Sequence, residues 1–215
     1  MKALNIKLLF AFFAVTILLS GCKKDENELS RPTYLPDLAI KGDFNYVILA
    51  GDEYEEPGAT ATVNGTPIDY TIAGTVDASE PGLYILTYTA TNSDGFSASA
   101  TRNVFVLPEP YNPEAANISG DYKRAANGRA SKVTTVVDGV YLMSDGWGSA
   151  SSGGQPLPVP CYLMCTNGVD ILMPNYPTVF GGMEGEGTYD GTKMSIYTIL
   201  VDQGPFARTN VWNKQ

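Results

Sequence analysis

Short alternating segments separated by tight-turn dipeptides recur through this 215-residue chain. Apolar and polar residues alternate in Leu83–Thr91 and in Ala98–Val106, as in strands that bury one face. Asn64-Gly65, Asp138-Gly139 and Asp190-Gly191 each separate two such segments, and these dipeptides are strong signals of two-residue hairpins. Leucine-rich periodicity of 3.6 residues is nearly absent. The pattern therefore predicts an all-β protein.

The amino terminus indicates the compartment. Two lysines precede Leu8–Leu19, which is apolar except for one threonine. This run fits the apolar region of a secretory signal and is shorter than the about 20 residues that a membrane-spanning helix needs. The Leu-Ser-Gly-Cys sequence that ends at Cys22 resembles the lipobox of bacterial lipoproteins. That resemblance implies that residues 1–21 are removed and that Cys22 carries the lipid; an ordinary secretory signal or a short membrane anchor is the alternative.

The residues after Cys22 indicate which face of the outer membrane the protein occupies. The charged segment Lys23–Glu28 resembles the export signal that sends Bacteroidetes lipoproteins to the outer face of the outer membrane. It implies a protein held at the outer membrane by the lipid on Cys22 and facing the exterior, whereas a plain solvated tether would also fit a periplasmic position. Residues 22–38 hold charges and prolines without a pattern, and we predict a tether there.

Composition narrows the classes of function. The chain has 14 basic and 23 acidic residues, and removal of the signal with its two lysines leaves 12 against 23, a net charge of −11. Nucleic acid is disfavoured as a partner because phosphates need a basic surface. The chain has no histidine, which excludes Ser-His-Asp and Cys-His catalysis and histidine-based metal sites. We expect no cofactor, no metal and no catalysis.

Residues 39–107 contain several expected strands: Asn45–Leu49, Thr60–Val63, Ile68–Ile72, Leu83–Thr91 and Ala98–Val106. Motifs follow one another along the same segment: Ala50–Ala61, Gly74–Asp77, Pro81–Tyr84, Thr87–Ala90, Asp94–Phe96 and Arg102–Val104. This order resembles the bacterial immunoglobulin-like (Ig-like) modules of surface proteins, which are related to hyalin-repeat domains. The resemblance implies a β-sandwich that acts as a spacer. Phe96 stands where the family often has asparagine, which disfavours a calcium site at that turn.

Residues 108–114 are rich in proline, and we predict a semi-rigid linker there. Residues 115–215 form the last expected domain, with strands at Ile118–Lys123, Lys132–Val137, Val140–Ser144, Val169–Met173, Gly185–Tyr189, Lys193–Val201 and Ala207–Trp212. Strands joined by tight turns predict an antiparallel β-meander or a small barrel. The segment loosely resembles the carboxy-terminal domain of Bacteroidetes lipoproteins that accompany Sus-type polysaccharide uptake. That resemblance implies a glycan as ligand and an outer-membrane transporter or another envelope protein as partner.

The long Gly/Ser/Pro-rich segment between Ser144 and Pro160 is the first candidate ligand-binding loop. An exposed Trp147 can stack on a sugar ring, while Asp145 and Gln155 hydrogen-bond to sugar hydroxyls. The alternative places Trp147 in the core, because tryptophan is usually mostly buried.

The segment 174–182 is a second expected loop. It carries Tyr176 and Phe180, which are either a stacking platform or residues that pack the loop. Trp212 lies in an alternating strand and is expected in the core.

One pair of glutamates and one pair of cysteines are further candidates for a chemical role. Glu184 and Glu186 share one face if their segment is a strand, as glycosidase carboxylates can, although nothing else in the sequence supports an active site. Cys161 and Cys165 are either free buried thiols or, if the chain bends between them, a disulfide. The sequence therefore predicts a lipid-anchored, non-catalytic surface protein that binds polysaccharide or oligosaccharide. A structural or adhesive module and a glycoside hydrolase are the alternatives.

Overall fold

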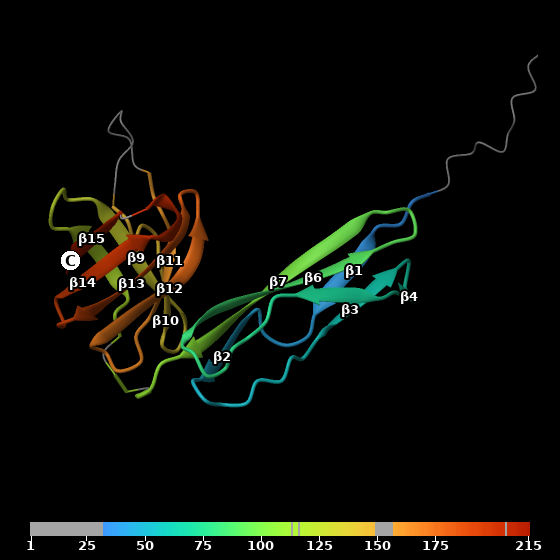
Figure 1. The fold of residues 1–215 in the computed structure, drawn as a ribbon, viewed down its shortest axis with the longest axis horizontal. Helices are drawn as coiled ribbons and strands as arrows, with labels where there is room; N and C mark the ends of the chain where they lie inside the picture. Colours follow the sequence, from blue (N-terminus) through green and yellow to red (C-terminus); the bar gives the residue numbers. More distant parts are fainter. Residues whose placement is uncertain (1–31, 113, 116, 149–156, 205) are drawn as a thin grey trace, which may run out of the picture. The chain divides into compact units, whose positions relative to one another are not determined.

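The computed structural model describes residues 32–112, 114–115, 117–148, 157–204 and 206–215. Its elements are strands together with one short 3-10 turn, η2 (Val201–Gln203), so the all-β prediction is confirmed (Figure 1). Within these residues no helix has the length and apolar character needed to cross a bilayer.

The amino-terminal strands form two sheets. One sheet has the order β1-β3-β4 and the other has the order β2-β7-β6-β5. Their bounds are β1 (Pro36–Ile40), β2 (Asn45–Leu49), β3 (Ala59–Val63), β4 (Thr66–Pro67), β5 (Tyr70–Ala73), β6 (Gly82–Thr91) and β7 (Ser97–Leu107). Alternate residues of these strands meet in a core that contains Ala59, Leu86, Tyr88 and Val104. The predicted Ig-like sandwich is thus present.

Two details differ from the expected bounds. Strand β1 begins at Pro36 and pairs with β3, so it runs across the boundary expected between the tether and the sandwich. The strand expected at Ile68–Ile72 is displaced, because the chain pairs first as β4 and then again as β5. The hairpin at Asn64-Gly65 forms where the dipeptide predicts it, with positive φ angles of 50° and 77°.

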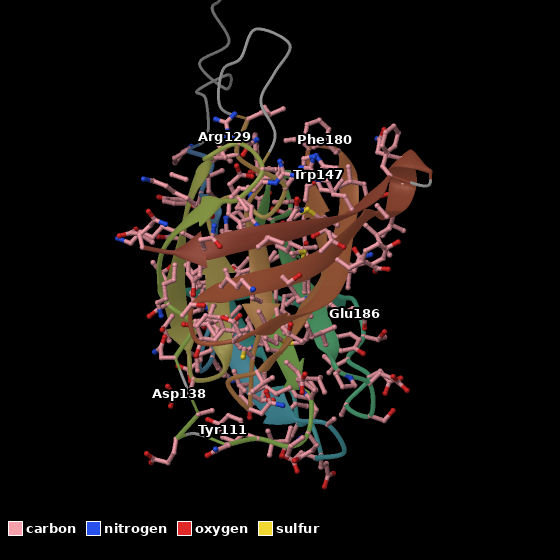
Figure 2. The ribbon with its side chains drawn as sticks, turned by 90° about the vertical axis from the view of Figure 1, so that its left-hand side faces the viewer. Tyr111, Arg129, Asp138, Trp147, Phe180 and Glu186 are labelled. Atoms are coloured by element: carbon pink, nitrogen blue, oxygen red, sulfur yellow. The ribbon has the colours of Figure 1, made fainter. Side chains whose placement is uncertain are left out.

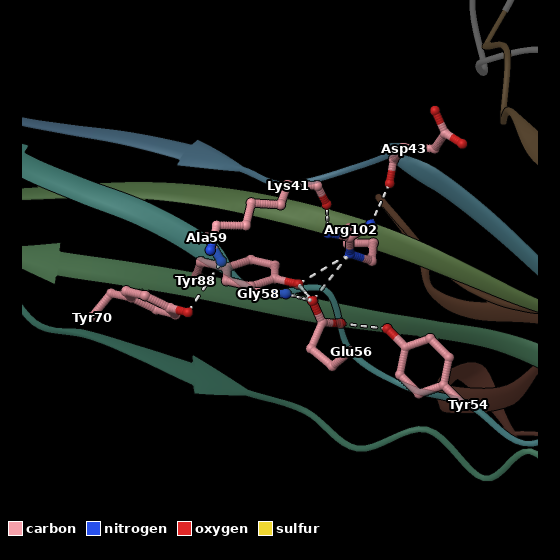
Figure 3. A network of polar contacts seen from close by, with 9 residues as sticks. All are labelled: Lys41, Asp43, Tyr54, Glu56, Gly58, Ala59, Tyr70, Tyr88 and Arg102. Carbon is pink, nitrogen blue, oxygen red and sulfur yellow. Dashed lines mark hydrogen bonds and ion pairs between the residues drawn. The ribbon is translucent and has the colours of Figure 1, made fainter.

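A buried arginine links the motifs of the sandwich (Figure 3). Arg102 of β7 is fully buried, and its Nε donates to the Tyr88 hydroxyl at 3.0 Å. Its two terminal nitrogens donate to the carbonyl oxygens of Asp43, at 2.6 Å, and Lys41, at 2.5 Å. The guanidinium thereby fixes the chain between β1 and β2 against the opposite sheet.

Glu56 neutralises this arginine. Its Oε1 lies 3.5 Å from Arg102 Nε and accepts the Gly58 amide at 2.7 Å. The hydroxyls of Tyr54 and Tyr88 also donate to the Glu56 carboxylate. Burial opposes ionisation of Glu56, but these hydrogen bonds and the charge of Arg102 outweigh it and lower the pKa of Glu56. The motif around Glu56 is therefore structural.

Among the described residues, eight strands close into an antiparallel barrel in the order β10-β11-β12-β13-β14-β15-β8-β9. They are β8 (Gly120–Arg124), β9 (Ala130–Val137), β10 (Val140–Met143), β11 (Cys161–Met164), β12 (Asp170–Thr178), β13 (Gly181–Tyr189), β14 (Lys193–Leu200) and β15 (Ala207–Lys214). Each strand pairs with the next along the chain, and β15 pairs with β8. The meander is therefore closed.

Side chains fill the barrel. Trp212 is fully buried, as predicted, and packs in one cluster with several methionines: Met143, Met173, Met183 and Met194. A separate buried cluster joins Phe105 and Leu107 of β7 to Val140 and Met164 of the barrel. Residues of the sandwich and of the barrel thus share buried contacts.

One expected loop is a strand pair instead. Most of the segment 174–182 belongs to β12 and β13, which leaves only Val179 and Phe180 between the two strands. The pairing register shifts between Met173 and Tyr176, and Pro174 lies at this irregularity. Proline is tolerated at such a bulge because the ladder hydrogen bond is already lost there.

Candidate functional site

The carboxylate of Asp145 closes the loop that precedes β11. Asp145 is buried, and its Oδ1 accepts the backbone amides of Gly148 at 2.8 Å and of Val159 at 3.2 Å. These bonds hold the two ends of the loop together on either side of residues 149–156. The sequence-based hypothesis was that this carboxylate accepts hydrogen bonds from sugar hydroxyls. In the structure it accepts them from backbone amides of its own loop instead. Gln155 lies outside the described residues.

Trp147 is half-buried against the barrel core, as its packing alternative predicts. The guanidinium of Arg208 lies 3.9 Å from the centre of its ring, and Arg208 also donates to the Trp147 carbonyl oxygen. Burial, followed by the charge of Arg124, lowers the pKa of Arg208 to about 10. A cation–π contact therefore covers part of the indole that was expected to meet a sugar.

The two remaining aromatic candidates, Phe180 and Tyr176, pack against different residues. Phe180 packs against the barrel core, and Figure 2 shows it near Trp147 at one end of the barrel. Tyr176 lies in β12, and its ring meets the edge of Tyr162 at 5.2 Å between centroids. The structure therefore places Trp147, Asp145 and Phe180 at the barrel end, while Tyr176 packs with Tyr162.

A groove on the outer face of the barrel combines an exposed aromatic ring with hydrogen-bonding side chains, which the ligand-binding residues predicted from the sequence do not. Its centre is Tyr197 of β14, whose side chain is 46% exposed. In the strand register Tyr197 lies directly opposite Glu186 of β13, and Glu186 lies opposite Leu172 of β12. Figure 2 places Glu186 on the flank of the barrel, away from Trp147 and Phe180. We call this tract the Tyr197 groove.

The Tyr197 groove has a volume of about 490 Å³. Tyr84 of β6 contributes to one wall, and Leu172 and Ile199 add apolar surface. Asn175, Glu184 and Glu186 are polar residues of its lining, and Asn175 Nδ2 donates to Glu184 Oε2 at 2.9 Å. This bond sets the orientation of both side chains. The groove thus combines an exposed aromatic ring with fixed hydrogen-bonding groups.

Two glycines allow this arrangement. A Cβ atom on Gly185 would overlap the carbonyl oxygen of Tyr197, and one on Gly187 would overlap that of Ser195. Strands β13 and β14 therefore approach so closely that only glycine fits at these inward positions. This explains why glutamate and glycine alternate along β13. Gly185 and Gly187 face the neighbouring backbone, and Glu184 and Glu186 line the groove.

The sequence identified part of this site and missed its centre. The spacing of Glu184 and Glu186 predicts one shared face, and both residues line the Tyr197 groove. Tyr197 and Asn175 were missed because their neighbours come from other strands. The only usable signal was a tyrosine at a polar position of the alternating segment Lys193–Val201.

Cys161 and Cys165 are both free and both buried, so the disulfide alternative is excluded. Burial raises the pKa of each thiol. In the described part of the chain no group of three or more acidic or cysteine side chains is placed to hold a metal ion.

Comparison with known protein families identifies the sandwich. Residues 38–106 match the family described as "Bacterial surface protein, Ig-like domain", which confirms the Ig-like prediction. Among solved structures, a lipoprotein from Bacteroides thetaiotaomicron is similar with 25% sequence identity and a TM-score of 0.41. The alignment covers 84% of this chain and 100% of that chain. The search of curated proteins found no match.

Proposed function

We propose that this chain is a lipid-anchored protein of the bacterial outer membrane that faces the exterior and binds oligosaccharides in the Tyr197 groove without cleaving them. The exposed Tyr197 ring, with Glu186 directly beside it and Asn175 in the lining of the same groove, carries the proposal. A tyrosine ring offers an apolar face to the C–H groups of a sugar, and adjacent carboxylate and amide groups bond its hydroxyls. Binding sites for small ligands have volumes of roughly 300–1,000 Å³ and a few fixed polar groups, as here.

Affinity electrophoresis tests the proposal. The full-length protein, purified from membranes in detergent, is run through gels that contain the polysaccharides on which its host grows. Retardation by at least one polysaccharide is expected, and Tyr197→Ala should weaken binding at least about fivefold, if stacking of a sugar on the ring is worth as much as the roughly 1–3 kcal/mol of a nucleobase stacked on an aromatic side chain.

Tyr34 provides the matched control. It is 48% exposed, and the bond that it makes with Asn92 uses only its backbone oxygen. Tyr34→Ala should therefore bind like the wild type. The proposal fails if no polysaccharide retards the protein, or if Tyr197→Ala binds as strongly as Tyr34→Ala.

The anchor rests on the lipobox-like sequence at Cys22, which lies outside the described residues. The match of residues 38–106 to a family of bacterial surface domains supports a surface location. Cys22→Ala should abolish incorporation of labelled fatty acid. Protease added to intact cells should degrade the wild type if it faces the exterior; protection of the protein would overturn the exterior orientation.

Absence of catalysis is part of the proposal. The chain has no histidine to act as a general base near neutral pH, which supports it. Prolonged incubation should leave every bound polysaccharide intact. Release of reducing ends by the wild type, but not by Glu184→Gln or Glu186→Gln, would instead make the protein a glycosidase.

A second candidate function is docking to an outer-membrane transporter or another envelope protein. Val179, Val201 and Phe206 are exposed apolar residues on two turns at one end of β13 and β14. The turns are joined because Asp202 Oδ2 accepts the Gly182 amide at 2.7 Å and Gln203 Nε2 donates to the Phe180 carbonyl oxygen at 3.0 Å. Crosslinking in intact cells should recover a partner with the wild type, and recovery should fall in Val179→Ser/Phe206→Ser.

A further inference from the structure

We infer that the Tyr197 groove selects uncharged glycan chains, binds them along several sugar units, and rejects acidic glycans. This inference rests on the proposed function and adds the class and length of the ligand. Three observations carry it: a second hollow that continues the groove, the row of side chains across the strands, and the sign of the charges along the lining.

The groove continues into a second hollow of about 560 Å³. Glu186 and Tyr197 line both hollows, so the two share a boundary and form one tract. The second hollow adds the hydroxyls of Thr188, Ser195 and Thr209. Hydroxyl side chains both donate and accept hydrogen bonds, as sugar hydroxyls do. Tyr197 therefore lies in the interior of the tract, where it can contact a unit within a chain as well as a terminal unit.

The register gives the tract its length. Leu172, Glu186, Tyr197 and Thr209 lie opposite one another in sequence across β12, β13, β14 and β15. Neighbouring strands are about 4.8 Å apart, so the row extends for roughly 14 Å. One sugar ring cannot contact both ends of such a row. An oligosaccharide that crosses the strands can contact Leu172 at one end and Thr209 at the other.

The charges determine the class of glycan. Among the described residues that line the two hollows, the charged side chains are all carboxylates: Asp170, Glu184 and Glu186. Carboxylates accept hydrogen bonds from neutral hydroxyls and repel the carboxylate or sulfate groups of an acidic glycan. A like-charge contact at about 4 Å weakens binding by at least about fivefold even in water-like surroundings. A chain with an acidic group on each unit meets several such contacts.

Calorimetry on the full-length protein in detergent tests the inference. The probes are a neutral series, from disaccharide to hexasaccharide, prepared from the polysaccharide that binds best, and the same series after oxidation of the primary hydroxyls to carboxylates. The affinity of the neutral series should rise with length and then reach a plateau. The oxidised hexasaccharide should bind at least about tenfold more weakly than the neutral one.

Two variants assign these effects to the tract. Asp170→Asn/Glu184→Gln/Glu186→Gln nearly keeps the size of the three side chains and should bring the affinities for the oxidised and neutral hexasaccharides to within about threefold of each other. Thr209→Val should weaken the hexasaccharide more than the disaccharide, because Thr209 lies at one end of the row and a longer chain contacts it in every register.

The outcomes separate this inference from the function on which it rests. If neither the neutral nor the oxidised series binds, both fail; if only the oxidised series binds, the inference alone fails. If a disaccharide binds as tightly as a hexasaccharide, or if the oxidised series binds as well as the neutral series, the inference fails and glycan binding stands. Tighter binding of a cationic amino-sugar polymer than of every neutral glycan also overturns it.

Discussion

The guanidinium of Arg208 lies over the ring of Trp147, 3.9 Å from its centre, and the same side chain bonds the Trp147 carbonyl oxygen. Arg208 projects from β15, whereas Trp147 follows β10, so the contact joins segments that are 61 residues apart in the sequence. It fixes the loop after β10 to the barrel end. Trp147 therefore has a structural role that an exposed sugar platform does not.

Trp147→Ala should lower the free energy of unfolding of the barrel by about 2–4 kcal/mol, somewhat less than a fully buried tryptophan would, because Trp147 is only half-buried. Denaturant unfolding followed through Trp212 fluorescence measures this change. Retardation by polysaccharide should stay at the wild-type level under native conditions. Full stability combined with lost binding would instead support the sequence-based hypothesis that Trp147 is the sugar platform.

Glu56 should make the stability of the sandwich depend on acid pH. Its pKa is lowered in the folded state, so its contribution is complete above the unfolded value of about 4.3 and is lost as pH falls through the lower folded value. Glu56→Gln should cost about 1–3 kcal/mol at pH 7 and progressively less toward acid pH. Hydrogen exchange of residues 36–107, measured across this range, follows the change. If the stability of the wild type and of Glu56→Gln changed with pH in the same way, this prediction would be contradicted.

Gly185→Ala should damage the Tyr197 groove through the backbone. The added methyl group meets the carbonyl oxygen of Tyr197, so β13 and β14 must separate, at a cost of about 1–3 kcal/mol or more. Gly82 is the control for stability, because its added Cβ would lie 3.5 Å from the Tyr84 ring, an ordinary contact. Thermal unfolding temperature and polysaccharide affinity should both fall in Gly185→Ala. An equal fall of the unfolding temperature in Gly82→Ala would contradict the role of the close approach of the two strands.

The buried thiols should resist chemical modification in the folded protein. Cys161 and Cys165 are shielded from solvent, and burial raises the pKa of both, so little thiolate is available to react. A maleimide at neutral pH should leave both unmodified in the native protein and modify both in denaturant without a reductant. Mass spectrometry counts the added groups. Failure to label in denaturant until a reductant is added would reveal a disulfide.

The sequence predicted the elements whose signals are local. Asn64-Gly65, Asp138-Gly139 and Asp190-Gly191 end their strands where the structure has turns, because the backbone of a tight hairpin requires such residues. Strand β11 was missed because Cys161–Met164 is short and nearly continuously buried, without alternation. The loop prediction for residues 174–182 is wrong, because Pro174 and Pro177 belong to β12, whose register is irregular there.

The site was harder to predict than the fold. Glu184 and Glu186 could be placed on one face from their spacing, because side chains alternate along a strand. That Tyr197 lies beside Glu186 depends on which residues of β13 and β14 pair. That Arg208 covers Trp147 depends on closure of the barrel. Pairing and closure are set by packing of the whole domain, and no local stretch of sequence encodes them.

The pairing of β15 with β8 has a consequence for the order of folding during synthesis. Trp212 of the last strand pairs with Arg124 of the first, so the barrel keeps two open edges until almost the whole chain is present. The strands β1–β7 lie entirely within residues 36–107 and depend on no later strand for their pairing. A chain delivered from its amino end therefore completes its sandwich first. A truncation that removes only Ala207–Lys214 should leave the whole barrel unclosed and prone to aggregation.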